Sequence, residues 1–449
     1  MSGKFVLKLR NKFKDKDLKE ILLGSSLALI YRIVGMISGY ILILVISRHY
    51  GSKGVGIYNL STSVLAIYTL VGTLGLKTYC LRFVSQLCNE GKYYKVYQLY
   101  IKIFQITIPL SLILVFIFFI PADKLSLYVF KDETLAHAFK VLSLVLPFTV
   151  VYEVNVEFIR GLKDVKYSEF LRNVTVPVFN TIFLVLIALF VVNYYISIYS
   201  YVIAIVISFL LSTFYIVKKI YGFKKCPGEK TSSSEILKVS LPMIMTSFAR
   251  LIMGKITTIM LGIYSTTEQV GIFSVSLKLA SITSFVLMAI NTISAPKFSE
   301  LFWSNKIEDL KKVVKFSSKL IFIISVPILC IFIMLPELSM KFFGKEFSTG
   351  KYALIFLVIG QFVNACAGSV GIFLNMTGNQ NYFRNIMFIS AALNIILNYL
   401  LIPRYGLNGA AIATMVSMSL WNIAGAVHIK LKHNISTFYI PLPYKLKKR

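Results

Sequence analysis

The feature that most constrains this chain is a series of long apolar stretches, each long enough to cross a bilayer as a helix. Because lipid offers no hydrogen-bond partners to the backbone, spans of this length must be helical, and the alternating strands of a membrane barrel are absent from the sequence. We predict an all-α polytopic membrane protein with twelve transmembrane helices. The spans are residues 21–47, 56–78, 103–120, 141–157, 173–193, 197–217, 239–263, 271–294, 320–335, 352–375, 385–402 and 409–428.

Composition and the placement of charge support this assignment. The 449 residues are 57% hydrophobic and 15% charged, with a mean hydropathy of +0.74 and a net charge of +29. Of the 48 Lys and Arg residues, 34 lie in alternate loops that include both termini, and nine lie in the opposite loops. The positive-inside rule therefore predicts that both termini are cytoplasmic. We interpret the excess charge as topology and attraction to anionic membrane lipid, and we expect no nucleic-acid partner.

The chain is also repeated. Gly54-Val55-Gly56-Ile57-Tyr58 corresponds to Gln269-Val270-Gly271-Ile272-Phe273 at a shift of 215 residues, and Glu133 corresponds to Glu346 at 213. An even number of spans per repeat gives two parallel six-helix bundles related by an axis along the membrane normal. The expected divisions are a basic leader (1–20), the first bundle (21–217), a cytoplasmic linker (218–238), the second bundle (239–428) and a basic tail (429–449). Segments 122–138 and 337–350 are expected to contain short helices at the outer interface.

Two arginines lie deep in matching spans. Arg32 and Arg250 are each 11 residues into their span, about 16 Å at helical rise. A guanidinium at the bilayer centre costs roughly 2.5 to 3.5 kcal/mol on insertion scales, so such a residue is a functional-site hypothesis. Either these arginines face a wet cavity, where they can bind phosphate, or they bond backbone carbonyls between packed helices. Lys255 and Lys278 are further candidates for substrate binding; Lys278, like Lys77, can also reach an interface.

Other polar groups within the spans are fewer. Glu153 and Glu157 share one face of the fourth span, and we consider an ion-coupling role for both, although an interfacial carboxylate also explains Glu157. Asn291 can bond sugar hydroxyls or a neighbouring helix. The dispersed cysteines and histidines predict no metal site, and no catalytic set or nucleotide-binding loop is present. We expect no cofactor.

The segment from Asn398 to Thr414, including Pro403-Arg404-Tyr405-Gly406-Leu407-Asn408-Gly409, resembles the eleventh-to-twelfth helix signature of polysaccharide and O-antigen flippases. Arg48-His49-Tyr50-Gly51 resembles their first-to-second helix turn. These flippases belong to the multidrug/oligosaccharidyl-lipid/polysaccharide exporter superfamily, and the resemblance covers nearly the whole chain.

The resemblance implies a V-shaped pair of bundles around a central cavity. Such a protein carries a polyprenyl-(pyro)phosphate-linked oligosaccharide from the cytoplasmic to the outer leaflet of the cell membrane by alternating access, in cell-surface polysaccharide assembly. Its partners are that glycan lipid, membrane lipid and other membrane proteins of glycan assembly. Arg32 and Arg250 are the positions that match the cationic cavity residues of such proteins.

Three alternatives stay open. A multidrug cation antiporter of the same superfamily would need carboxylates in the early helices, where this chain has arginine. A membrane-bound polysaccharide polymerase or glycosyltransferase would need a large catalytic outer loop, which is absent here. A scaffold for a glycan-assembly complex would tolerate loss of both arginines.

Overall fold

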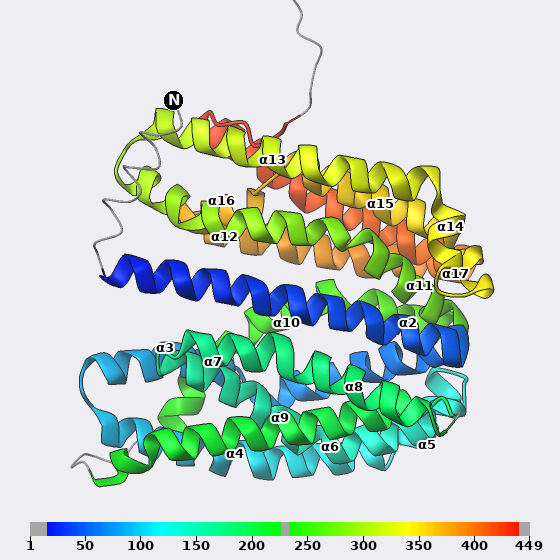
Figure 1. Ribbon diagram of the computed structural model, residues 1–449, viewed down its shortest axis with the longest axis horizontal. Coiled ribbons are helices and arrows are strands. Elements are labelled where there is room, and N and C mark those ends of the chain that lie inside the picture. The colour runs from blue at the N-terminus through cyan, green and yellow to red at the C-terminus, as the bar shows by residue number, and fades with distance from the viewer. Residues whose placement is uncertain (1–15, 192, 226–232, 440–449) are drawn as a thin grey trace, which may run out of the picture. The chain divides into compact units, whose positions relative to one another are not determined.

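The computed structural model describes residues 16–191, 193–225 and 233–439, and this part of the chain is helical with no strand (Figure 1). The elements of the first half of the chain are α2 (Lys16–Thr73), α3 (Leu76–Asn89), α4 (Tyr93–Phe119), α5 (Ala122–Lys124), η1 (Leu125–Val129), α6 (Thr134–Gly161), α7 (Val165–Phe170), η2 (Leu171–Thr175), α8 (Val176–Ala188), α9 (Ile196–Ile220) and η3 (Tyr221–Lys225). Those of the second half are α10 (Ser233–Tyr264), α11 (Thr267–Ala280), α12 (Ile282–Trp303), α13 (Ile307–Met334), α14 (Pro336–Lys341), η4 (Lys345–Gly350), α15 (Lys351–Ala367), α16 (Val370–Met376) and α17 (Gln380–His433).

The helices confirm the twelve predicted spans. Eight described helices are long and apolar enough to cross a membrane, and the pair α11–α12, bent by 41°, makes a ninth. Two of the eight, α2 and α17, are 58 and 54 residues long and turn at a non-helical glycine, Gly51 and Gly406. A helix of that length would extend about 80 Å, more than twice the hydrocarbon thickness, so each contributes two spans. The 32-residue α10 supplies the twelfth.

Two compact units are present. Within the described residues, unit 1 comprises the chain up to Val45, Leu65–Ala122 and His137–Met245, and unit 2 comprises Ile46–Val64, Asp123–Ala136 and Thr246 onward. The predicted bundle division at 218–238 stays a prediction, as does the V shape. Residues 1–15 of the expected leader, 226–232 of the linker and 440–449 of the tail lie outside the described residues.

Small residues, three of them serines, line the packed face of α9 in unit 1. In α9, Ser200, Ala204, Ser208 and Ser212 recur every four residues and are buried. This spacing forms one helix face on which a neighbouring backbone can approach closely, as between membrane helices. On another face of α9, Phe214 is 71% exposed, as expected for a lipid-facing side chain.

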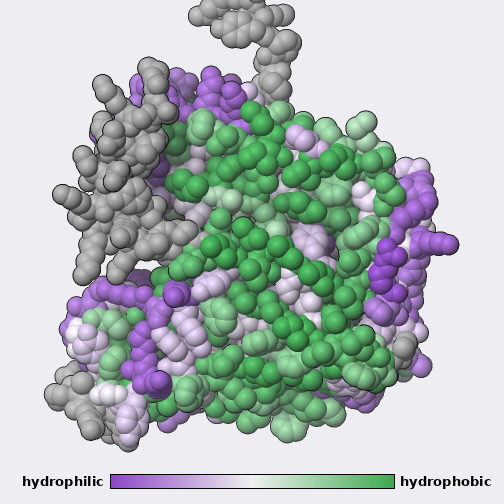
Figure 2. Space-filling view, viewed as in Figure 1, coloured by the Kyte–Doolittle hydropathy of each residue, from purple (hydrophilic) through white to green (hydrophobic). Residues whose placement is uncertain are grey.

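The surface agrees with a membrane environment. Hydrophobic side chains cover the middle of the face shown in Figure 2, and hydrophilic ones gather toward its left and right margins. Among the exposed apolar residues are Ile120 and Phe190, at 73% and 86%. Surfaces this apolar are not stable in water, so the chain is a multi-pass membrane protein.

Short helices lie where the sequence predicts them. Segment 122–138 contains α5 and η1, and segment 337–350 contains most of α14 and all of η4. Both pieces are too short to span a bilayer, and they connect the third and fourth spans of each repeat. This prediction of short helices is confirmed.

Candidate functional site

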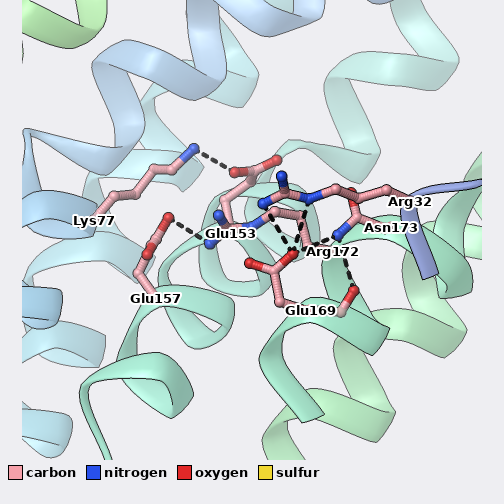
Figure 3. A network of polar contacts seen from close by, with 7 residues as sticks. All are labelled: Arg32, Lys77, Glu153, Glu157, Glu169, Arg172 and Asn173. Carbon is pink, nitrogen blue, oxygen red and sulfur yellow. Dashed lines mark hydrogen bonds and ion pairs between the residues drawn. The ribbon is translucent and has the colours of Figure 1, made fainter. Parts of the chain in front are cut away.

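A cluster of seven polar residues lies among the helices of unit 1 (Figure 3). It draws side chains from α2, α3, α6, α7 and η2, four of which belong to helices that qualify as membrane spans. The residues are Arg32, Lys77, Glu153, Glu157, Glu169, Arg172 and Asn173. Three are cations and three are carboxylates, so with all six charged the cluster carries no net charge.

Arg32 is held by a carboxylate. Its Nε and Nη2 atoms each lie 3.3 Å from Oε2 of Glu169, and the same oxygen accepts a hydrogen bond from Asn173 Nδ2 at 2.9 Å. The Glu169 side chain is 2% exposed and that of Arg32 is 30% exposed. A carboxylate removed from water this completely needs a charged and hydrogen-bonded partner, and Arg32 supplies the charge.

Local backbone geometry brings these two residues together. A Cβ on Gly35 would lie 1.9 Å from the carbonyl oxygen of Asn173, so α2 and η2 approach closely only because position 35 has no side chain. Three residues on, Ser38 Oγ donates to the carbonyl of Pro177 at 2.9 Å. Arg32, Gly35 and Ser38 therefore lie on the face of α2 that contacts η2 and the start of α8.

The π-helical segment η2 carries two residues of the cluster. It widens the helix between α7 and α8 over Leu171–Thr175 and includes Arg172 and Asn173. The hydroxyl of Tyr152 donates to the carbonyl of Leu171 at 2.6 Å, which satisfies a carbonyl at the widened turn. Such single-turn π segments occur frequently at functional sites.

The remaining carboxylates of the cluster also hold cations. Glu153 forms an ion pair with Lys77, and Glu157 Oε1 accepts from Arg172 Nη2 at 2.6 Å. The second oxygen, Oε2 of Glu157, is buried and has no hydrogen-bond partner within the described residues. Both predicted ion-coupling residues are therefore engaged by cations, and Glu157 retains a buried oxygen without a donor among the described residues.

Unit 2 presents cations differently. Lys255 of α10 and Lys278 of α11 lie nine and 11 residues from the helix ends at Tyr264 and Thr267, so they sit at similar depths of roughly 14 and 17 Å. The positive charge of Lys255 acts on Lys278, and the effect is repulsive. For Lys255, the described part of the chain shows no ion pair with a carboxylate. This pair of lysines is the feature of unit 2 best suited to an anion.

Broken helices accompany the cations of both units. Lys278 lies three residues before the bend between α11 and α12 at Ser281, and Lys77 follows the left-handed break at Leu74 and Gly75. Interrupted membrane helices leave backbone groups without helical partners, and in transporters they commonly mark the binding region.

Family comparison decides the classification. The model of a family described as polysaccharide biosynthesis protein matches residues 21–302, more than half of the chain. The chain belongs to this family. The MatE model also matches residues 242–400, and the resemblance seen in the sequence is confirmed.

Curated relatives of this family member match part of its length. The probable low-salt glycan biosynthesis flippase Agl15 of Haloferax volcanii is 24% identical over 223 residues, which are 49% of this chain and 46% of that protein. The chain spans about half the length of the first curated relatives it matches.

Solved structures share the fold. An inward-facing multidrug resistance MATE family transporter of the MOP superfamily superposes with a TM-score of 0.73 at 12% identity, covering 90% of this chain and 98% of that one. The lipid II flippase MurJ in an inward closed conformation gives 0.67 at 16% identity, covering 91% and 87%. At these identities the likeness shows the fold alone.

The structure of this family member places the other predicted residues as follows. Arg250 lies in α10, but its side chain is outside the described residues, so the pairing of two arginines stays a prediction. Asn291 in α12 has a buried Oδ1 without a partner among the described residues. Seven residues after Arg250 in α10, Thr257 is buried and forms hydrogen bonds with Asn394 and Asn398 of α17. This part of α10 is a helix-packing contact.

Sequence reasoning missed Glu169, Arg172 and Asn173. It assigned residues 158–172 to a loop and counted only two carboxylates within spans, whereas the membrane-length helix runs from Val165 to Ala188 and contains Glu169. The available signal was Asp164, whose carboxylate accepts from the Tyr167 backbone N–H at 3.1 Å and caps the helix. An Asp at this position is a common helix start.

No metal-binding group of three or more His, Cys, Asp or Glu side chains occurs within the described residues. The carboxylates of the unit 1 cluster are instead matched one to one by Lys and Arg. The interactions of the unit 1 cluster are therefore ion pairs and hydrogen bonds.

Proposed function

We propose that this protein is a flippase that moves a polyprenyl-(pyro)phosphate-linked oligosaccharide from the cytoplasmic to the outer leaflet of the cell membrane by alternating access. Membership of the polysaccharide biosynthesis family and the relative named as a glycan biosynthesis flippase support this proposal. So does the MOP-type fold, because the fold is shared with transporters. The glycan lipid, membrane lipid and other glycan-assembly membrane proteins are the proposed partners.

The observation that carries the proposal is Lys255, which lies deep in a membrane helix and shows no ion pair within the described residues. An ammonium group at this depth is costly to bury unless an anion joins it, and the positive charge of Lys278 repels it further. A phosphate or pyrophosphate carries the opposite charge and offers several acceptor oxygens to such donors. Arg32, partly exposed beside Glu169, and Asn291, with its unpaired carbonyl oxygen, are the further binding residues that we propose.

Glu153 and Glu157 are proposed to couple transport to an ion. Each holds a cation, and Glu157 Oε2 is the atom at which a proton or sodium ion could join without displacing a protein donor. Binding there would weaken the ion pair between Glu157 and Arg172, and the Arg172 guanidinium could then bind a phosphate. The match to the MatE model favours an antiporter of cationic drugs as the second candidate, but the lysine pair of unit 2 would repel such substrates.

The experiment uses cells that lack their own flippase. Lys255→Ala combined with Lys278→Ala should abolish rescue and leave lipid-linked glycan accessible only on the cytoplasmic leaflet. Lys255→Arg with Lys278→Arg should retain most of the activity because the charge is kept. The matched control is Lys312→Ala, since Lys312 is 77% exposed and pairs with Asp309 on the surface. Full rescue by the double alanine variant at equal expression would contradict the proposed site.

A further inference from the structure

The segment that follows Gly51 is capped by a carboxylate from the second repeat. The backbone at Gly51 has φ 65° and ψ −167°, in the region that glycine tolerates best, and the helix resumes at Ser52. Glu346 of η4 accepts a hydrogen bond from the Ser52 backbone N–H at 2.6 Å through Oε1 and from Ser52 Oγ at 3.0 Å through Oε2. A carboxylate at a helix start also opposes the positive end of the helix dipole.

The start of α11 is held by a carboxylate from the first repeat. Thr267, the first residue of α11, donates its hydroxyl to Asp132 Oδ2 at 2.6 Å. The other oxygen of Asp132 accepts from the backbone and hydroxyl of Thr134, and Lys53 Nζ lies 3.8 Å from it. Asp132 belongs to the segment between the third and fourth spans of the first repeat, as Glu346 does in the second.

These two contacts are related by the internal repeat. Ser52 and Thr267 are 215 residues apart, the same shift that relates Gly54–Tyr58 to Gln269–Phe273. Asp132 directly precedes Glu133, which the sequence matches to Glu346. Each repeat therefore supplies one carboxylate to the helix start of the other.

The two helices also cross at equivalent glycines. A Cβ on Gly56 would lie 1.9 Å from the carbonyl oxygen of Thr267, and one on Gly271 would lie 1.9 Å from that of Ser52. Each helix thus carries a small residue and a glycine four positions apart, Ser52 with Gly56 and Thr267 with Gly271. This pattern permits the close backbone approach found between tightly packed membrane helices.

We propose that these six residues form a reciprocal latch that joins the two repeats at the outer end and must part whenever that end opens. The latch consists of Ser52, Gly56, Asp132, Thr267, Gly271 and Glu346. All six belong to unit 2, and the charge asymmetry of the loops places their end of the helices outside. Because the caps are exchanged, neither repeat can move away without breaking both at once. The latch goes beyond the proposed function and holds whatever the transporter carries.

The test measures the distance between the two outer ends directly. Spin labels at His49 and Tyr264, exposed residues that are also 215 apart, report this distance by pulsed electron resonance in lipid nanodiscs. Reactive native cysteines are replaced first. Wild type should show a dominant short distance. Glu346→Gln or Asp132→Asn should raise the ratio of open to closed protein about tenfold, and the double variant about a hundredfold, because a hydrogen bond to a charged group is lost in each.

Further variants separate the latch from general damage. Thr267→Val keeps the side-chain volume and removes the hydroxyl donor, so it should resemble Asp132→Asn. Gly56→Ala should abolish the short distance, whereas Gly222→Ala, where a Cβ meets nothing within 4 Å, should leave it unchanged. An unaltered distribution in the folded double carboxylate variant or in Thr267→Val would overturn the latch. No substrate is used, so a failure of the proposed flippase function would not affect this result.

Discussion

The two units treat the cations that lie among their helices in opposite ways. In unit 1 each of Arg32, Lys77 and Arg172 has its own carboxylate, whereas in unit 2 Lys255 lies near Lys278 and shows no ion pair among the described residues. A paired cluster is held in one arrangement by its own charges. A lysine without a carboxylate partner, such as Lys255, can instead be stabilised by an anionic ligand. We therefore propose that unit 1 provides structure and coupling and that unit 2 attracts the anion.

The largest loss of stability is expected at Glu169, which pairs with Arg32 in unit 1. Glu169→Ala leaves Arg32 without its partner in a membrane helix, and we expect it to lower the free energy of unfolding by about 3 to 5 kcal/mol. Thermal unfolding of the purified protein in detergent measures this loss. Combining it with Arg32→Ala should recover part of the stability, because the uncompensated charge is then absent. Additive losses in the double variant would show that the two residues do not act as a pair.

Gly35 tests whether close helix approach positions the unit 1 cluster. The alanine methyl would overlap the carbonyl of Asn173, so Gly35→Ala should cost about 1 to 3 kcal/mol of stability as α2 shifts from η2. Thermal unfolding gives the magnitude, and Gly222→Ala, with open space around its Cβ, is the control. Equal melting temperatures for the two variants would mean that the approach at Gly35 is not needed.

Two carboxylates outside the spans, Asp164 in unit 1 and Asp132 in unit 2, should show the same pH dependence of stability. The difference between the two units is then confined to the membrane interior. Burial raises the pKa of Asp164 and of Asp132, but hydrogen bonds from Tyr215 to Asp164 and from Thr134 and Thr267 to Asp132 outweigh it, so both pKa values lie below the ordinary value. The stability that each contributes is present above the ordinary Asp pKa and is lost as pH falls through the lowered pKa.

Asp164→Asn and Asp132→Asn should each cost about 1 kcal/mol at pH 7, and the difference from wild type should vanish toward pH 2. Unfolding in denaturant across this pH range measures both variants. A difference that persisted unchanged at pH 2 would assign the loss to packing instead of charge.

The smallest effect on stability is expected at Lys255. Lys255→Met removes one of two repelling charges, so stability should change by less than about 0.5 kcal/mol or rise, while glycan-lipid transport falls by at least tenfold. Thermal unfolding and leaflet distribution of the glycan lipid are measured on the same preparation. A large loss of stability with normal transport would reverse the roles of the two units.

The sequence was sufficient to predict the features that depend on hydropathy within one helix or on order along the chain. Hydropathy located the twelve spans, and the shift of 215 residues identified the repeat before any contact was known. It was less informative about the start of the fifth span, because Asp164, Glu169 and Arg172 look like loop residues by hydropathy alone. Only the helix cap at Asp164 and the partners of Glu169 show that this polar turn belongs to a membrane helix.

The identity of charge partners could not be obtained from one sequence. Arg32 and Glu169 are 137 residues apart, and their contact depends on the missing side chain of Gly35 and on the widened turn η2. Likewise, the depth of Lys255 and Lys278 in the membrane could be predicted from the sequence. Their mutual repulsion could be recognised only once the structure placed α10 beside α11.

By itself, the sequence determined the membrane environment, the number of helices, the repeat and the family resemblance, because each follows from local hydropathy or from order along the chain. Tertiary structure alone decided which buried charges are matched, and which helix start each outer carboxylate holds. The physical reason is range: a bilayer selects apolar length residue by residue, whereas an ion pair depends on atoms a few ångströms apart that the chain brings together from distant positions.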